Sequence, residues 1–145
     1  MRARVKWIEG VAWMAEADSG HGLVIDGSPA IGGRNLGPRP MELVLQGLIS
    51  CSGMDVVSIL RKQRQDVVDV VVEAEAERAE DPPRVFTRIA LTYRVIGRNL
   101  RPKAVERAVR LSADTYCSVS KMLSATVEIT DRIEIVDLAA PPADG

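Results

Sequence analysis

The sequence predicts an α+β fold in which strands and helices follow the order βββ-α-ββ-α-β. Three observations predict it. Short segments of alternating apolar and polar residues occupy the N-terminal part and the middle of the chain. A long run of almost entirely apolar or small residues between them indicates a buried helix. A second segment with helical apolar spacing precedes a final strand, and the short connections predict mostly antiparallel pairing.

Three short strands are expected over residues 2–8, 11–17 and 23–25. In the first of them Ala3, Val5 and Trp7 lie on one side and basic residues on the other, which is the alternation of a strand. The turn signals Ser19-Gly20 and Asp26-Gly27 follow the second and third segments. The three strands therefore form a meander, followed by a loop rich in glycine and proline over residues 28–39.

A long helix is expected over residues 40–64. Pro40 stands where the first helical turn tolerates proline, with Glu42 close behind it. Basic residues gather at the other end, which suits the helix dipole. Its middle, residues 43–60, is so uniformly apolar or small that burial nearly all round is predicted.

The second half of the chain predicts a hairpin, a helix and a strand. Residues 67–78 and 84–96 alternate and are separated by a break at residues 81–83, so they form a hairpin with one wetted face. A helix is expected over residues 102–123 and a strand over residues 126–136. The predicted domain is therefore residues 1–138, with residues 139–145 as a frayed tail rich in proline and alanine.

Charge and composition narrow the function classes. The 145 residues carry 19 basic and 20 acidic side chains, for a net charge of −1, so the basic footprint of a nucleic-acid-binding protein is missing. No apolar run is expected to approach the roughly 20 residues that cross a bilayer. The N-terminus lacks the apolar core of a signal peptide. The sequence thus predicts a cytoplasmic protein without nucleic-acid or membrane partners.

Chemistry is expected at the two cysteines, Cys51 and Cys117. Their separation fits no zinc motif, and His21 as the single histidine cannot complete a tetrahedral set, so neither a metal nor a cofactor is expected. A structural disulfide would be unusual in a reducing compartment. Buried free cysteines are common in protein cores, so two inert thiols remain an open alternative.

The neighbours of both cysteines favour a reactive pair. Cys51 lies in the long helix beside Ser50, Ser52 and Gly53, which are small enough to let a substrate or another backbone approach. Cys117 lies in the second predicted helix, also beside serines. Lys121 follows it by one helical turn and could favour its thiolate, or could simply face water.

At these residues the sequence resembles the OsmC/Ohr family, the osmotically inducible and organic hydroperoxide resistance proteins, and within it the YhfA-like branch. The resemblance extends to about residue 136 and covers the same element order. It is carried by residues 37–43 (GPRPMEL), by Cys51 in the long helix, by residues 55–60 (DVVSIL) and by residues 116–119 (YCSV).

The resemblance implies an intertwined homodimer in which antiparallel sheets from both subunits wrap around two central helices. Active members of the family are thiol peroxidases of the oxidative stress response. By this likeness Cys51 would attack the peroxide and become a sulfenic acid, and Cys117 would resolve it to a disulfide. An external dithiol would then reduce the disulfide. An apolar pocket at the subunit interface would admit a hydrophobic organic hydroperoxide.

The family's charged partners of the thiolate are only partly present. The usual glutamate directly follows the helix-opening proline, whereas here Met41 follows it and Glu42 comes next. At about 100° per residue, Met41 lies roughly 80° from Cys51 around the helix and Glu42 about 180° away. Glu42 could equally be a carboxylate that stabilises the helix N-terminus.

The family's arginine comes from an early loop that has none here. Arg34 and Arg39 in the next loop could replace it or could face water. His21 falls at the expected place and could be a turn residue or a contact to the other subunit's site.

Three functions follow as alternatives. The first is a cysteine-based hydroperoxide reductase. The second is a non-catalytic or weakly catalytic protein of the same fold that binds an apolar or thiol ligand at the dimer interface. The third is a dimer in which both cysteines are inert. The incomplete set of charged partners shifts weight from the first alternative to the second. A thiol without a positive neighbour is less acidic, so it would react more slowly with a peroxide.

Overall fold

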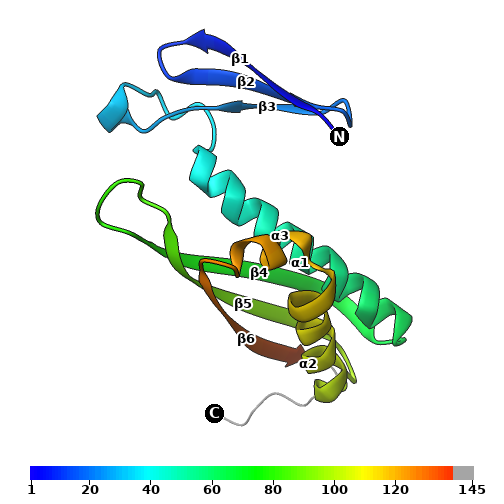
Figure 1. Cartoon of the computed structure of the whole chain (residues 1–145). Helices are drawn as coiled ribbons and strands as arrows, with labels where there is room; N and C mark the ends of the chain where they lie inside the picture. The colour runs from blue at the N-terminus through cyan, green and yellow to red at the C-terminus, as the bar shows by residue number, and fades with distance from the viewer. Residues whose placement is uncertain (139–145) are drawn as a thin grey trace. The chain divides into compact units, whose positions relative to one another are not determined.

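The computed structural model describes residues 1–138, and the chain divides into two compact units, Met1–Gln46 and Gly47–Gly145 (Figure 1). The long helix α1 (Pro40–Lys62) begins in the first unit and contributes most of its length to the second. The fold is α+β, as predicted, and the single-domain assignment of residues 1–138 stays a prediction. The expected frayed tail lies outside the described residues.

The first unit contains the predicted meander. Strands β1 (Ala3–Glu9), β2 (Ala12–Ala17) and β3 (Gly22–Ile25) form a three-stranded antiparallel sheet in the order β1-β2-β3. Trp7 pairs with Trp13 across the first two strands, and a register shift follows Trp7. A short 3-10 turn, Pro29–Ile31, interrupts the loop that leads to α1.

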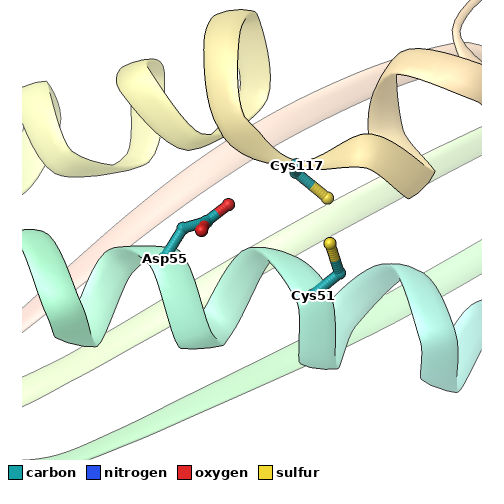
Figure 2. Close-up of side chains that lie close together, drawn as sticks. All are labelled: Cys51, Asp55 and Cys117. Carbon is teal, nitrogen blue, oxygen red and sulfur yellow. The ribbon is translucent and has the colours of Figure 1, made fainter.

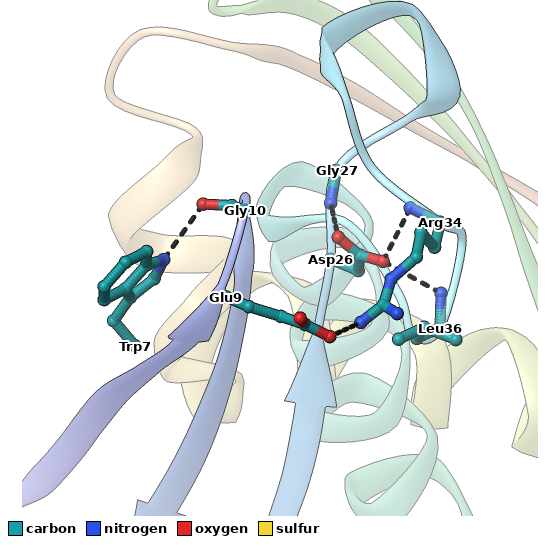
Figure 3. Close-up of polar contacts among 7 residues, drawn as sticks. All are labelled: Trp7, Glu9, Gly10, Asp26, Gly27, Arg34 and Leu36. Carbon is teal, nitrogen blue, oxygen red and sulfur yellow. Dashed lines mark hydrogen bonds and ion pairs between the residues drawn. The ribbon is translucent and has the colours of Figure 1, made fainter.

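The loop after β3 is organised by one buried carboxylate (Figure 3). Asp26 is 2% exposed and accepts hydrogen bonds from the backbone amides of Gly27, Arg34 and Leu36 at 2.7, 3.0 and 3.1 Å. These bonds, that of Leu36 above all, lower the pKa of Asp26. A single side chain thus fixes the backbone of a segment rich in glycine and proline.

Helix α1 buries one face, not its whole circumference. Its buried residues are spaced by four positions: Leu48, Ser52, Val56 and Leu60. Met54, between two of them, is 73% exposed. The prediction of burial nearly all round is therefore wrong for the described chain, because the second unit covers α1 on one side only. On its other sides the residues of α1 are half-buried or exposed within residues 1–138.

The length and composition of α1 also correct a sequence expectation. Its 23 residues are long and apolar enough to cross a membrane on those two criteria, whereas no such run was expected. Core helices of globular proteins meet the same criteria. Here α1 carries four residues packed inside the second unit, so its apolar character has a structural use there.

The second sheet has the order β4-β5-β6, with β5 in the centre. Strands β4 (Asp66–Arg78) and β5 (Phe86–Arg98) form the predicted antiparallel hairpin. Strand β6 (Glu128–Asp137) pairs with β5 in parallel, because the chain returns through a helical crossover and not through a tight turn. The buried residues of β5 alternate, as one covered face requires: Ile89, Leu91, Tyr93 and Val95.

The crossover is not the single helix expected over residues 102–123. It consists of α2 (Pro102–Leu111), a π-helical turn (Ser112–Tyr116), an extended residue and α3 (Ser118–Leu123). The extended residue is Cys117, with φ −70° and ψ 103°. Cys117 is therefore the N-cap of α3 and not an interior helical residue, a correction that apolar spacing could not supply. Wide π turns of this kind often accompany functional sites.

Candidate functional site

The fold brings both cysteines together with one carboxylate. The Sγ atoms of Cys51 and Cys117 and a carboxylate oxygen of Asp55 all lie within 4.8 Å of one another. Cys51 and Asp55 project from the same side of α1, one turn apart, and Cys117 faces them from the start of α3 (Figure 2). In Figure 2 the two sulfurs point toward each other. Both cysteines are free thiols.

Asp55 is the residue that the sequence argument missed. Its spacing of four from Cys51 places both residues on one face of the helix. That spacing was the available signal. The signal is weak, because a carboxylate beside a cysteine does not by itself favour a thiolate.

The two thiols differ in burial, and burial also affects the acidity of Cys117. Cys117 is 1% exposed, whereas Cys51 is half-buried. Burial raises the pKa of Cys117 to about 11, and the neighbouring Cys51 adds to the rise. The amide of Ser120 donates to Cys117 Sγ at 3.3 Å and acts in the opposite direction. Cys117 is therefore a neutral thiol near neutral pH, and Cys51 is the more accessible of the pair.

A buried chain of hydroxyls leads to Asp55. Ser52 Oγ lies 2.5 Å from the Tyr93 hydroxyl and 2.9 Å from Ser112 Oγ, and Ser112 Oγ donates to Asp55 Oδ2 at 3.2 Å. With Ser112 donating to the carboxylate, Ser112 accepts from Ser52, and Ser52 accepts from Tyr93. Burial raises the pKa of Tyr93 to about 12, so its phenol keeps the proton that the chain requires.

This hydroxyl chain accounts for a polar residue in an apolar helix. Ser52, 1% exposed, joins α1 to β5 through Tyr93 and to the π turn through Ser112. Buried hydroxyls are stable in a core when they are paired with one another. The π turn begins at Ser112, which joins these hydroxyls, and it ends directly before Cys117. The same contacts that hold the elements together thereby hold the carboxylate beside the thiols.

The charged residues expected to assist Cys51 are engaged within the first unit. Arg39 Nη1 pairs with Glu42 Oε1 at 3.0 Å, and the Arg39 amide donates to Glu42 Oε2 at 2.9 Å. These bonds, the amide first, lower the pKa of Glu42, which is the behaviour of a carboxylate at a helix N-terminus. Arg34 pairs with Glu9 (Figure 3). His21 Nδ1 lies 3.2 Å from Ser19 Oγ. A supporting role for any of them stays a prediction.

Lys121 is an exposed residue of α3 whose backbone amide donates to the Cys117 carbonyl oxygen at 3.0 Å. Its ammonium group was predicted either to favour the Cys117 thiolate or to face water, and a supporting role stays a prediction. The pKa of Cys117 is raised, chiefly because the thiol is buried.

The same three side chains could hold a metal ion. Two sulfurs and a carboxylate oxygen within 4.8 Å are donors that Zn²⁺ accepts, with a fourth position left for water. The spacing of the cysteines and the single histidine along the chain predicted no metal. The donor set arises from the fold, which adds Asp55 to the two thiols.

The raised pKa of Cys117 makes stability depend on alkaline pH. Between the ordinary value of 9.0 and about 11, the folded chain holds a proton that the unfolded chain has released. The free energy of unfolding therefore falls as pH rises through this window, and the contribution of Cys117 is complete below it. Tyr93, raised from 10.0 to about 12, adds a fall at higher pH.

Urea titrations of the reduced protein at about pH 8 and about pH 10 measure this effect. We expect the wild type to lose more stability between the two than Cys117→Ser, which keeps the Tyr93 contribution. An equal loss in both proteins would contradict the assignment of the raised pKa to Cys117.

Comparison with known proteins places these observations in a family. The family model described as "OsmC-like protein" matches residues 32–131. "Protein YhfA" of Escherichia coli K12 is 50% identical over 136 residues, which cover 94% of this chain and 98% of that protein.

Solved structures share the fold. A hypothetical protein from Aquifex aeolicus VF5 is 29% identical with a TM-score of 0.81, covering 92% of this chain and 94% of that one. A structure named as an organic hydroperoxide resistance protein OsmC from Legionella pneumophila has a TM-score of 0.68 at 17% identity, covering 92% and 95%. At that identity the likeness concerns the fold alone.

Proposed function

The chain belongs to the OsmC-like family, and from that premise we propose that it is a thiol-dependent reductase of organic hydroperoxides. Cys51 is the attacking thiol and Cys117 the resolving thiol. The observation that carries the proposal is the pair of facing sulfurs, which lie within 4.8 Å of each other although one belongs to α1 and the other to the residue that precedes α3. The name of the Legionella structure agrees with the substrate class.

The roles follow from the difference between the thiols. The Cys51 thiolate attacks the distal peroxide oxygen, the O–O bond breaks, and the alkoxide leaves and takes up a proton to become an alcohol. Cys51 is then a sulfenic acid. Cys117 attacks its sulfur, the two residues form a disulfide, and the hydroxyl leaves as water. Half-burial of Cys51 suits a group that must meet a substrate, and full burial of Cys117 suits one that meets only Cys51.

Several further features belong to the same proposal. An external dithiol reduces the disulfide, and a cytoplasmic location keeps the thiols reduced between cycles. A homodimer would cover the apolar sides of α1 that residues 1–138 leave open, such as that of Met54. A hydrophobic peroxide suits a pocket at that interface. Residues 1–138 would act as one domain within it.

Mixing the reduced protein with cumene hydroperoxide tests the proposal. The expected result is consumption of one peroxide per chain and a Cys51–Cys117 disulfide in the mass spectrum. Hydrogen peroxide is expected to react more slowly, because an apolar site favours an apolar substrate. The matched reference is free glutathione at the same thiol concentration. A rate no higher than that of glutathione would reject the reductase and leave ligand binding without turnover as the better account.

A further inference from the structure

The second half of the proposed reaction needs a proton carrier. When Cys117 attacks the sulfenic acid of Cys51, it must lose the proton on its sulfur, and the departing hydroxyl must gain one to leave as water. Cys117 is 1% exposed, so bulk water has little access to that proton. A protein group close to both sulfurs is therefore required if the step is to be fast.

Asp55 is placed for this work. One of its carboxylate oxygens lies within 4.8 Å of both sulfur atoms. Ser112 Oγ donates to Oδ2 at 3.2 Å and fixes the orientation of the carboxylate, and the hydroxyls of Ser52 and Tyr93 continue the same hydrogen-bonded chain. The carboxylate is thus held in one position beside the reacting atoms.

The other polar groups of the site are poor bases. The Tyr93 phenol, with a pKa of about 12, keeps its proton, and the serine hydroxyls are weaker acids still. Their hydrogens are also committed to the chain that ends on the carboxylate. A carboxylate is the group of this cluster that can accept a proton and return it within one reaction step.

We propose that Asp55 is a further catalytic residue, which takes the proton of Cys117 and delivers it to the hydroxyl that leaves Cys51. One S–H bond and one S–O bond break, and one S–S bond and one O–H bond form. The proton moves from sulfur to carboxylate to water, so the step needs no other reactant. This inference rests on the proposed function, because the sulfenic acid arises from the peroxide reaction.

The variant Asp55→Asn tests the inference, since its amide oxygen still accepts from Ser112 while losing the ability to take up a proton. Sulfenic acid is measured by dimedone trapping in the Cys117→Ser background, and disulfide by mass spectrometry of quenched time points in the Cys117 protein. Sulfenic acid formation is expected to stay within about threefold of the Asp55 protein, while disulfide formation slows by about a hundredfold or more.

Two matched variants complete the design. Asp55→Glu keeps the carboxylate and is expected to recover much of the disulfide rate. Asp69→Asn, which changes an exposed aspartate of β4, is expected to change neither rate.

The outcomes separate the two proposals. Disulfide formation as fast in Asp55→Asn as in the wild type overturns the role of Asp55 and leaves the reductase standing. Equal slowing of both steps also overturns it, because Asp55 would then act on Cys51 or on the fold. Absence of sulfenic acid in the Cys117→Ser protein overturns the proposed function and this inference together. If Asp55→Asn fails to fold, Ser112→Ala, which leaves the carboxylate but removes its hydrogen bond, must slow disulfide formation by about tenfold or the inference fails.

Discussion

Replacing Cys51 with serine is expected to slow reduction of cumene hydroperoxide by about a thousandfold or more. A serine hydroxyl is not ionised near neutral pH, whereas a thiolate is a strong nucleophile even when only a fraction of the thiol is ionised. Stopped-flow measurement of peroxide loss under single-turnover conditions gives the rate constant. The remaining Cys117 cannot substitute, because it is buried and its pKa is raised to about 11.

The matched control for this variant is Cys117→Ser. It should consume one peroxide per chain at nearly the wild-type rate and then stop with Cys51 as a sulfenic acid. A Cys51→Ser protein that keeps the wild-type rate, or a Cys117→Ser protein that loses the first turnover, would contradict the assignment of the two roles. The first result would point to Cys117 as the attacking thiol.

Truncation of Ile89 to alanine is expected to lower the free energy of unfolding by about 2–5 kcal/mol. Ile89 is fully buried on β5, the central strand of the second sheet, with Ala76 of β4 and Ile129 of β6 as its cross-strand partners. Truncating its side chain leaves a cavity, because β5 is hydrogen-bonded to β4 and to β6 and cannot move freely to fill the space. Urea denaturation followed by circular dichroism measures the loss.

Val68→Ala is the control for Ile89→Ala. Val68 belongs to β4 and is 51% exposed, so its truncation should change stability by about 0.5 kcal/mol or less. Equal losses in the two variants would mean that β5 is not the centre of the packed core. A large loss in Val68→Ala alone would mean that another surface covers β4 in solution.

The regular elements could be predicted because their signals are local. The alternation in β4 and β5 and the opening of α1 at Pro40 were visible in the residues themselves. The break at Cys117 was not, since apolar residues keep their helical spacing on both sides of the π turn. The predicted burial of α1 was too extensive, because the sequence of an apolar helix does not indicate whether its own chain or another surface covers it.

The candidate site was predictable only in part, because only some of its residues carry a local signal. The two cysteines were singled out by their number and their small neighbours, and the structure places their sulfurs together. The contribution of Asp55 depends on Ser112, which lies far along the chain and approaches only through the turn after α2. Glu42 and Arg39 were predicted, from the family resemblance, as possible supporting residues for the Cys51 thiolate. In the structure they pair with each other at the start of α1. The Arg39–Glu42 pair is local, since the two residues are three positions apart, whereas the contact of Ser112 with Asp55 depends on tertiary geometry.

The sulfur of Cys117 is also the cap of α3, through the amide of Ser120. A helix of six residues therefore begins on an atom whose bonding changes when a disulfide forms. Oxidation would alter the sulfur that accepts from the Ser120 amide, and with it the order of the first turn of α3. Formation of the proposed disulfide would therefore also change the backbone beside the exposed side chains of Lys121 and Met122.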